Sequence, residues 1–244
     1  MSNQKITIIT VCYNSSKTIE RTINSVLTQT YDDLEYLIID GNSQDGTLEI
    51  LNHYKEQFSQ KGISYSYISE PDQGIYDAIN KGIKMATGGW VSIINSDDWL
   101  EENTLSTEFA IHLQDDVDLL YGFVKFYRNG IATSQEVIFE SELPWRTMHH
   151  QGIIYRKELH DCYGYYSLVN RVCSDYLFLA SCFINKARFK FINKLIAHFS
   201  HGGSHTQLAY HAGVEEATIK LKFGFITKVE YYKKLIKAFS RKFL

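Results

Sequence analysis

The first hundred residues alternate between strand-like and helix-like segments, and this alternation constrains the fold more than any other feature. Short runs that favour strands lie at residues 6–11, 36–39, 64–68 and 90–94. Between them, apolar residues recur at helical spacing over residues 19–27, 48–58 and 75–83. Strand–helix repeats of this length predict a parallel sheet with right-handed crossovers. We therefore expect an α/β fold, with a single Rossmann-like domain and a mostly parallel central sheet.

Polar side chains follow three of the expected strands. Tyr13 and Asn14 follow the first strand, Asp40 ends the second, and Asp97 and Asp98 follow the fourth. Ligands bind beyond the carboxyl ends of strands in such sheets, so these residues are expected to share one site. Two adjacent carboxylates after a buried strand are costly unless they are paired or bind a cation, and hard oxygen ligands suit Mg²⁺ or Mn²⁺. The alternative for this acidic pair is a helix cap.

Composition limits the classes of protein that this chain can be. The 244 residues carry a formal charge of −3, which gives no reason to expect binding to nucleic acid. None of the four cysteines forms a C-x-x-C pair, so reduced thiols are expected. The first apolar run is too short for a signal sequence, and no stretch approaches the roughly 20 apolar residues of a membrane span. We expect a cytoplasmic protein, peripheral on the inner face of the membrane.

Four motifs occur in one order along the first hundred residues. They span residues 10–14, 40–47, 69–82 and 95–99. Together they resemble the motifs of the inverting glycosyltransferases of family 2, and the resemblance covers residues 5–205. It implies a GT-A fold over residues 1–205, with a nucleotide-sugar-binding half (1–117) and an acceptor half (118–205), followed by a basic amphipathic helical extension (206–244). It also implies transfer of a sugar from a nucleotide-diphosphate sugar, with a UDP-sugar expected, and a divalent metal cofactor (Mn²⁺ or Mg²⁺).

The resemblance assigns donor-binding roles to residues of these motifs. Tyr13 would border the nucleotide base, Asp40 would bind the base or the ribose, and Lys81 would meet phosphate charge. The full expected donor-binding set is Thr10, Tyr13, Asn14, Asp40, Asp72, Lys81, Ser96 and Asp97. A surface loop and a surface helix are the alternative interpretations for Asp72 and Lys81.

The metal would be held by acids that the resemblance also identifies. Asp97 matches the central acid of the family's D-x-D motif and is the first choice as ligand, with Asp98 second. His201 resembles a C-terminal histidine that completes the metal shell in some relatives, and a solvent loop is the alternative. Two positions depart from the commonest pattern. Asn95 stands where many relatives have the first acid of D-x-D, and Gly41 where many have a second acid after the strand.

The second half resembles the acceptor side of the family. Asp175 matches the aspartate that acts as general base and takes the proton of the acceptor hydroxyl, and a helix N-cap is the alternative. His149, His150 and Gln151 resemble an acceptor-side segment, and packing beneath a loop is the alternative. The implied acceptor is a glycan, linked to a polyprenyl diphosphate, in bacterial polysaccharide biosynthesis.

The last part of the chain is basic and apolar together. Residues 218–244 carry eight Lys or Arg against one acid, Glu230, interleaved with apolar and aromatic residues. This pattern suits an anionic membrane surface, and docking on the domain or a homodimer contact is the alternative.

Two other functions stay open from the sequence. One is a module that binds nucleotide sugar without turnover, which Asn95 makes conceivable. The other is a sugar nucleotidyltransferase, which the segment 12–17 disfavours because it lacks a loop rich in glycine and basic residues.

Overall fold

The computed structural model describes residues 4–113, 116–201 and 209–240. Its strands are β1 (Ile6–Cys12), β2 (Leu34–Asp40), β3 (Ser64–Ser69), β4 (Trp90–Ile93), β5 (Trp99–Leu100), β6 (Leu119–Arg128), β7 (Ile131–Glu136), β8 (Ile153–Arg156) and β9 (Phe189–His201). Its α-helices are α1 (Ile19–Leu27), α2 (Thr47–His53), α3 (Lys55–Lys61), α4 (Ile75–Met85), α5 (Leu159–Tyr163), α6 (Ser174–Ile184), α7 (Ala209–Lys222) and α8 (Lys228–Ser240). Short 3₁₀ helices are η1 (Thr107–His112), η2 (Glu140–Glu142) and η3 (His150–Gly152).

The described strands form one sheet of nine, in the order β3-β2-β1-β4-β8-β6-β9-β5, with β7 paired to β6. Strands β1 to β4 are parallel, as the strand–helix alternation predicts. Their register aligns Cys12 with Asp40 and Asp40 with Ser69, so three carboxyl ends lie side by side. The single α/β domain with a mostly parallel core is confirmed, and the predicted strands match β1 to β4 closely.

The second half of the chain adds a mixed part to the sheet. Strand β8 is antiparallel to β4 and to β6, while β9 runs parallel to β6. The 13-residue β9 also pairs with the short β5, where Trp99 lies opposite His198. This pairing carries the end of β9 to the segment that follows β4, so two distant parts of the chain meet at the carboxyl edge.

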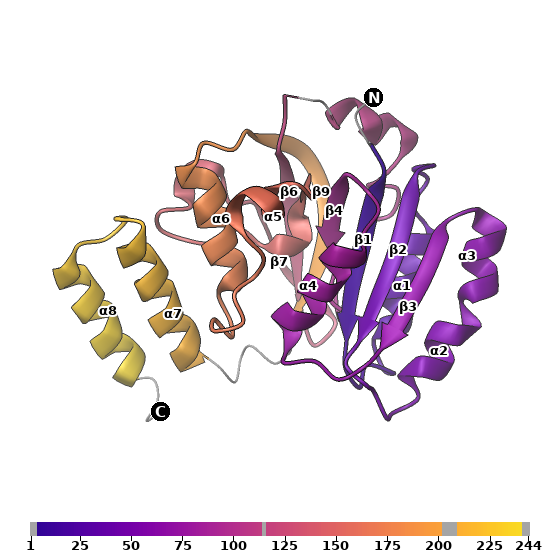
Figure 1. Cartoon of the computed structure of the whole chain (residues 1–244), viewed down its shortest axis with the longest axis horizontal. Helices are drawn as coiled ribbons and strands as arrows, with labels where there is room; N and C mark the ends of the chain where they lie inside the picture. Colours follow the sequence, from indigo (N-terminus) through magenta and orange to yellow (C-terminus); the bar gives the residue numbers. More distant parts are fainter. Residues whose placement is uncertain (1–3, 114–115, 202–208, 241–244) are drawn as a thin grey trace.

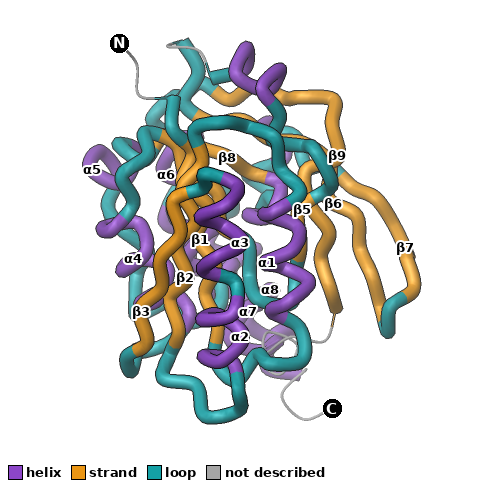
Figure 2. Tube along the Cα trace, turned by 90° about the vertical axis from the view of Figure 1, so that its right-hand side faces the viewer, coloured by secondary structure: helices purple, strands orange, loops and turns teal. Residues whose placement is uncertain are grey.

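Helices cover both faces of the sheet, as Figure 2 shows for α1 to α3 on one side and α4 to α6 on the other. Ile23 of α1 and Phe58 of α3 belong to one buried cluster with Ile8, and Ile79 of α4 belongs to the second with Ile9. Alternate residues of β1 therefore point into opposite cores, and full burial of each such side chain contributes about 1.5–3 kcal/mol.

The two C-terminal helices form a hairpin beside α6 (Figure 1). Ile219 of α7 is buried and joins the second core. Lys220 is also buried, and its ammonium group donates to the carbonyl of Trp145 and to the carboxylate of Glu216. A helical segment after residue 206 agrees with the sequence expectation, and its first helix packs into the body of the protein.

Candidate active site

The carboxyl ends of β1, β2 and β3 meet at Asp40, which is fully buried. One carboxylate oxygen accepts hydrogen bonds from Ser43 N (2.9 Å) and Ser69 Oγ (2.6 Å). The other accepts from the hydroxyl of Ser43 and from Cys12 Sγ (3.4 Å). A buried carboxylate with this many donors is stabilised where it lies. Asp40 therefore ties the three strand ends together beneath the surface of the site.

Thr10 is likewise fully buried, and its hydroxyl accepts a hydrogen bond from Tyr36 (3.1 Å). Its side chain lies in the core of the sheet, in contrast to the expectation that it contacts the donor. The reason is strand alternation, because Thr10 shares a face of β1 with Ile6 and Ile8.

Tyr13, Gly41 and Asp72 converge above this edge. The ring of Tyr13 is 64% exposed. A Cβ added at Gly41 would lie 2.6 Å from Asp72 Oδ2 and 3.4 Å from Tyr13 Cδ2. A larger residue at position 41 would therefore displace the carboxylate of Asp72, which fills the space that the second acid of many relatives would need. Asp72 is itself held by a hydrogen bond from Gly74 N (2.8 Å).

The loops after β1, β2 and β4 are joined by short polar contacts. Asn14, which has a left-handed backbone (φ 49°) that asparagine tolerates, donates its N–H to Ser43 Oγ (2.7 Å). The hydroxyls of Ser15 and Ser96 lie 2.8 Å apart, which links the first motif to the fourth. Lys81 pairs with Glu70 (2.8 Å) and donates to the carbonyl of Pro71, so it braces the loop that carries Asp72.

The Asp97–Asp98 turn is fixed from three sides. Asp98 is buried and accepts hydrogen bonds from Ser200 N (2.8 Å) and Gln151 Nε2 (2.7 Å). Arg21 donates to the carbonyl of Asp97 (2.7 Å). The interpretation of the acidic pair as a helix cap is wrong, because the strand β5 follows it.

Burial and the neighbouring charge of Asp97 raise the pKa of Asp98 to about 7. An acid in such surroundings keeps its charge at neutral pH most readily when a cation is close. Asp97 is only half-buried. The turn thus offers one buried carboxylate and one that borders the surface.

Asp175 lies in the first turn of α6 and is half-buried (side chain 17% exposed). Its carboxylate lies 3.4 Å from His150 Nδ1 and accepts hydrogen bonds from Tyr76 Oη (3.1 Å) and Tyr176 N (2.8 Å). Burial raises its pKa, but the hydrogen bonds and the charge of His150 outweigh burial and hold the pKa of Asp175 below its ordinary value. Asp175 is not the N-cap, which is Cys173.

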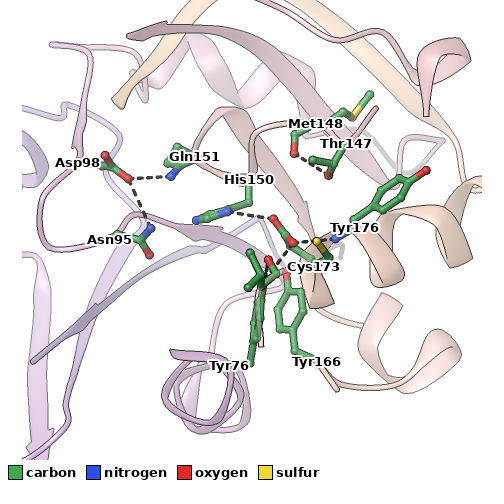
Figure 3. Close-up of polar contacts among 12 residues, drawn as sticks. Tyr76, Asn95, Asp98, Thr147, Met148, His150, Gln151, Tyr166, Cys173 and Tyr176 are labelled. Atoms are coloured by element: carbon green, nitrogen blue, oxygen red, sulfur yellow. Dashed lines mark hydrogen bonds and ion pairs between the residues drawn. The ribbon is translucent and has the colours of Figure 1, made fainter. Parts of the chain in front are cut away.

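Two successive residues connect the acidic turn with Asp175. Gln151 of η3 donates to the carboxylate of Asp98, as Figure 3 shows. His150 of the same 3₁₀ helix contacts Asp175. His149, which directly precedes η3, packs its ring against Phe126 (centroids 4.7 Å apart), and burial lowers the pKa of His149 to about 4. Asp98, which follows β4, and Asp175 on α6 are therefore connected through η3. The carboxyl ends of β1 to β4, called the donor edge below, and Asp175 thus form one candidate site.

His201 ends β9, directly after Ser200, which binds Asp98. Its ring lies beside those of Phe126 and Phe199. The other residues of its expected loop, 202–205, lie outside the described residues. Within the described part of the chain, no group of three or more His, Cys, Asp or Glu side chains forms a ready metal cluster. Two acids fit a Mg²⁺ or Mn²⁺ site that substrate phosphates and water complete, as is common for these ions.

Several supporting residues were not identified from the sequence. Arg21 stacks over Trp99 (3.6 Å from guanidinium carbon to ring centroid) while it holds the Asp97 carbonyl. Tyr76 lies in the third motif (residues 69–82), but its contact with Asp175 joins residues 99 positions apart, and nothing in the sequence indicates that contact.

Solved structures similar to this one define the fold. The TarS 1–349 fragment of S. aureus in complex with UDP-GlcNAc superposes with a TM-score of 0.70 at 22% identity, covering 98% of this chain and 72% of that chain. In a second TarS structure this chain covers 43% of the neighbour. A mannosyltransferase from Pyrobaculum calidifontis, PcManGT, in complex with GDP-Man and Mn²⁺, gives a TM-score of 0.69 at 17% identity, covering 96% and 68% of the two chains. The protein thus has the α/β GT-A fold.

Sequence comparison gives the family. The family model "Glycosyl transferase family 2" matches residues 7–178. A PGL/p-HBAD biosynthesis glycosyltransferase of Mycobacterium tuberculosis is 31% identical over 211 residues, which cover 83% of this chain and 79% of the relative. Glycosyltransferase GlyG of Streptococcus pneumoniae is 25% identical over 82% of this chain and 61% of its own length. The chain belongs to glycosyl transferase family 2 and is a glycosyltransferase, which sets aside the nucleotidyltransferase and the non-catalytic module.

Proposed function

We propose that this enzyme transfers a sugar from a nucleotide-diphosphate sugar to a hydroxyl group of a glycan, with inversion at the anomeric carbon. The observation that supports the proposal is that two successive residues, His150 and Gln151, contact the carboxylates of Asp175 and Asp98, respectively. A base next to the donor edge suits a direct displacement, in which the acceptor oxygen attacks from the side opposite the leaving diphosphate.

The nucleotide would lie over Tyr13, Gly41 and Asp72. An exposed aromatic ring offers a face on which a base can stack. The space above Gly41 is filled by Asp72, whose carboxylate would take the recognition role of the missing second acid. The neighbours TarS and PcManGT were solved with UDP-GlcNAc and GDP-Man, respectively, and we favour a UDP-sugar here. Asp40, which is buried, would act indirectly, by fixing the loops that carry Tyr13, Gly41 and Asp72.

A divalent cation would be held by Asp97 first, then Asp98, with His201 at the end of β9 as a further ligand. Such a cation, Mn²⁺ or Mg²⁺, balances the charge that grows on the departing diphosphate. Ser200 and Gln151 orient the carboxylate of Asp98. Arg21 fixes the backbone of the turn, so the two acids keep their places when the donor leaves.

Asp175 would accept the proton of the acceptor hydroxyl. The bond between the anomeric carbon and the diphosphate oxygen breaks, the bond to the acceptor oxygen forms, and the proton passes to a carboxylate oxygen of Asp175. Tyr76 and His150 keep this carboxylate ionised and oriented. His150 and Gln151 would border the acceptor, because they contact the base and the acidic turn, and His149, which precedes them and packs against Phe126, would border it from that side.

A panel of nucleotide sugars tests the proposal. UDP-glucose, UDP-galactose, UDP-N-acetylglucosamine and GDP-mannose would be compared by thermal shift with and without Mn²⁺. We expect at least one UDP-sugar to raise the melting temperature, since a ligand that binds only the folded state stabilises it by about 2.7 kcal/mol at 100 times its Kd. In the presence of a glycan acceptor, the enzyme should release UDP from the same nucleotide sugar. A shift with none of the four, or only with GDP-mannose, would contradict the UDP-sugar assignment.

Helix α8 carries an exposed apolar stripe, which we propose docks on an anionic membrane surface on the cytoplasmic side. Exposed fractions are 64% for Val229, 63% for Tyr232, 71% for Ile236 and 52% for Phe239, at spacings that fall on one side of the helix. Lys228, Lys233, Lys234 and Lys237 share this helix. Each basic residue near an anionic surface contributes about 1 kcal/mol. No helix in the described parts of the chain is long and apolar enough to span a membrane.

The double variant Ile236→Asp/Phe239→Asp is expected to lose most binding to phosphatidylglycerol vesicles in a flotation assay. Placing charge where two apolar side chains enter the lipid removes their burial, worth about 1.5–3 kcal/mol each. Ile131→Asp is the matched control, because Ile131 is 71% exposed but lies on β7. Equal flotation of the double variant and the wild type would contradict the membrane proposal. A change in molecular mass by light scattering instead would identify the stripe as a homodimer contact. An enzyme that is bound to the membrane surface is well placed to act on an acceptor that is linked to a lipid.

A further inference from the structure

Glu215 of α7 binds three successive backbone N–H groups of the segment that leads into α6. Its Oε1 accepts from Arg171 N (2.8 Å), and its Oε2 accepts from Val172 N (3.0 Å) and Cys173 N (2.9 Å). Successive N–H groups that converge on one carboxylate form a concave anion site, and such charge-assisted hydrogen bonds are stronger than neutral ones. Residues about 40 positions apart in sequence are thereby fixed to each other.

The segment held by Glu215 ends two residues before Asp175. Cys173 is the N-cap of α6, and its carbonyl accepts the hydrogen bond from Leu177 N (3.0 Å) in the first turn of that helix. The carbonyl of Val172 lies 2.6 Å from Tyr76 Oη, and the single proton of this hydroxyl is shared between that carbonyl and the carboxylate of Asp175. The position of residues 171–173 therefore sets both the start of α6 and the place of the tyrosine that contacts the candidate base.

Besides Glu215, residues 171–173 contact the hydroxyl of Tyr76 through the Val172 carbonyl and the carbonyl of Ala212 through Cys173 Sγ (3.6 Å), so Glu215 is the partner of their three N–H groups. Between α5 and α6 the chain has no regular secondary structure over residues 164–173, and Val169 is 89% exposed. Helix α7 itself is well anchored, through Ile219 in the core and through Lys220, whose ammonium group reaches the carbonyl of Trp145. The geometry is that of an anchored helix that presents one carboxylate to an irregular loop.

We propose that Glu215 is a positioning residue for the transfer reaction, which acts through residues 171–173 to hold Asp175 in its working place. The inference rests on the proposed role of Asp175 as the base. Glu215 does not touch the substrates. Loss of the Glu215 carboxylate leaves the donor edge of β1 to β4 intact. Asp175, the proposed base, is then no longer held in a fixed position relative to the acceptor hydroxyl.

The test compares Glu215→Ala and Glu215→Gln with Glu216→Gln. Glu216 is the neighbouring acid on α7; it pairs with Lys220 and is not a partner of the 171–173 backbone N–H groups. Release of nucleoside diphosphate would be measured with whichever of the four nucleotide sugars is turned over fastest, well below the melting temperature of each variant. We expect Glu215→Ala to lower kcat on the order of 10- to 100-fold with an unchanged donor KM, because small displacements of a catalytic group cost that much.

Two further results separate positioning from general destabilisation. Glu215→Gln keeps one acceptor oxygen, so its kcat should lie between those of Glu215→Ala and the wild type. Glu216→Gln should lower the melting temperature as much or more and leave kcat within twofold. The inference is overturned if Glu215→Ala keeps its kcat, or if kcat follows the melting temperature across all three variants. If Asp175→Asn is fully active in the same assay, the proposed function fails; if it is inactive while Glu215→Ala is normal, only this inference fails.

Discussion

Asp175→Asn is expected to bind nucleotide sugar as the wild type does while transfer falls by about 10²- to 10⁴-fold, the usual contribution of a positioned general base. The amide has the shape of the carboxylate but cannot take a proton from the acceptor hydroxyl. Donor binding should persist because the donor edge is built from β1 to β4, whereas Asp175 lies on α6. Thermal shift with the donor and a transfer assay measure the two properties separately.

The matched control is Asp161→Asn, which makes the same change at an exposed acid of α5. The pH profile gives a second check. The contacts of His150 and Tyr76 keep the pKa of Asp175 below the ordinary value for an aspartate. The carboxylate of Asp175 is therefore ionised at every pH above the ordinary aspartate pKa, and it is protonated only as the pH falls through the lowered pKa. The wild-type rate should therefore show no loss from this group in mildly acidic buffer. Unchanged transfer by Asp175→Asn would exclude Asp175 as the base.

Asp97→Ala is expected to lower turnover by at least about 100-fold and to abolish its dependence on added Mn²⁺. Loss of a ligand that positions the cation removes several kcal/mol of stabilisation from the developing diphosphate charge, and each 1.36 kcal/mol is tenfold in rate. Titration of the EDTA-treated enzyme with Mn²⁺ measures this directly, with calorimetry of Mn²⁺ binding as a readout independent of activity.

Asp33→Asn serves as control for Asp97→Ala, because Asp33 is an exposed acid just before β2, at the opposite edge of the sheet from the site. It should show the wild-type titration. A variant at Asp97 that keeps both its rate and its Mn²⁺ affinity would remove this residue from the metal site and leave Asp98 as the remaining candidate.

The parallel half of the fold could be predicted because its signals are local. Apolar runs such as residues 6–11 and helical spacing such as that of Ile79 and Ile83 are set by burial on two faces of one sheet. The mixed half lacks that signal. Strand β9 pairs with β6 and with β5, and nothing in the sequence around Trp99 indicates that it lies opposite His198.

The candidate site was predictable in its residue types and less so in its contacts. Motif order indicated Asp97, Asp98 and Asp175, but two residues expected at the donor, Thr10 and Asp40, are buried in this structure. The side chains that fix the acids come from distant elements, as with Ser200 on Asp98. Such long-range hydrogen bonds depend on the folded backbone and leave no periodic pattern in the chain.

The contact between Glu215 and residues 171–173 has a consequence for the order in which a functional enzyme forms on the ribosome. Synthesis runs from the N-terminus, and the N-terminal part of a chain folds first. The strands β1 to β4 that form the nucleotide edge, and the residues Gln151 and Ser200 that bind Asp98, are therefore made before α7. A nascent chain that has not yet made α7 is expected to bind the donor but to transfer its sugar slowly, because Asp175 is not yet held in place through Glu215. Full activity is thus expected only after α7 has been made and has bound residues 171–173.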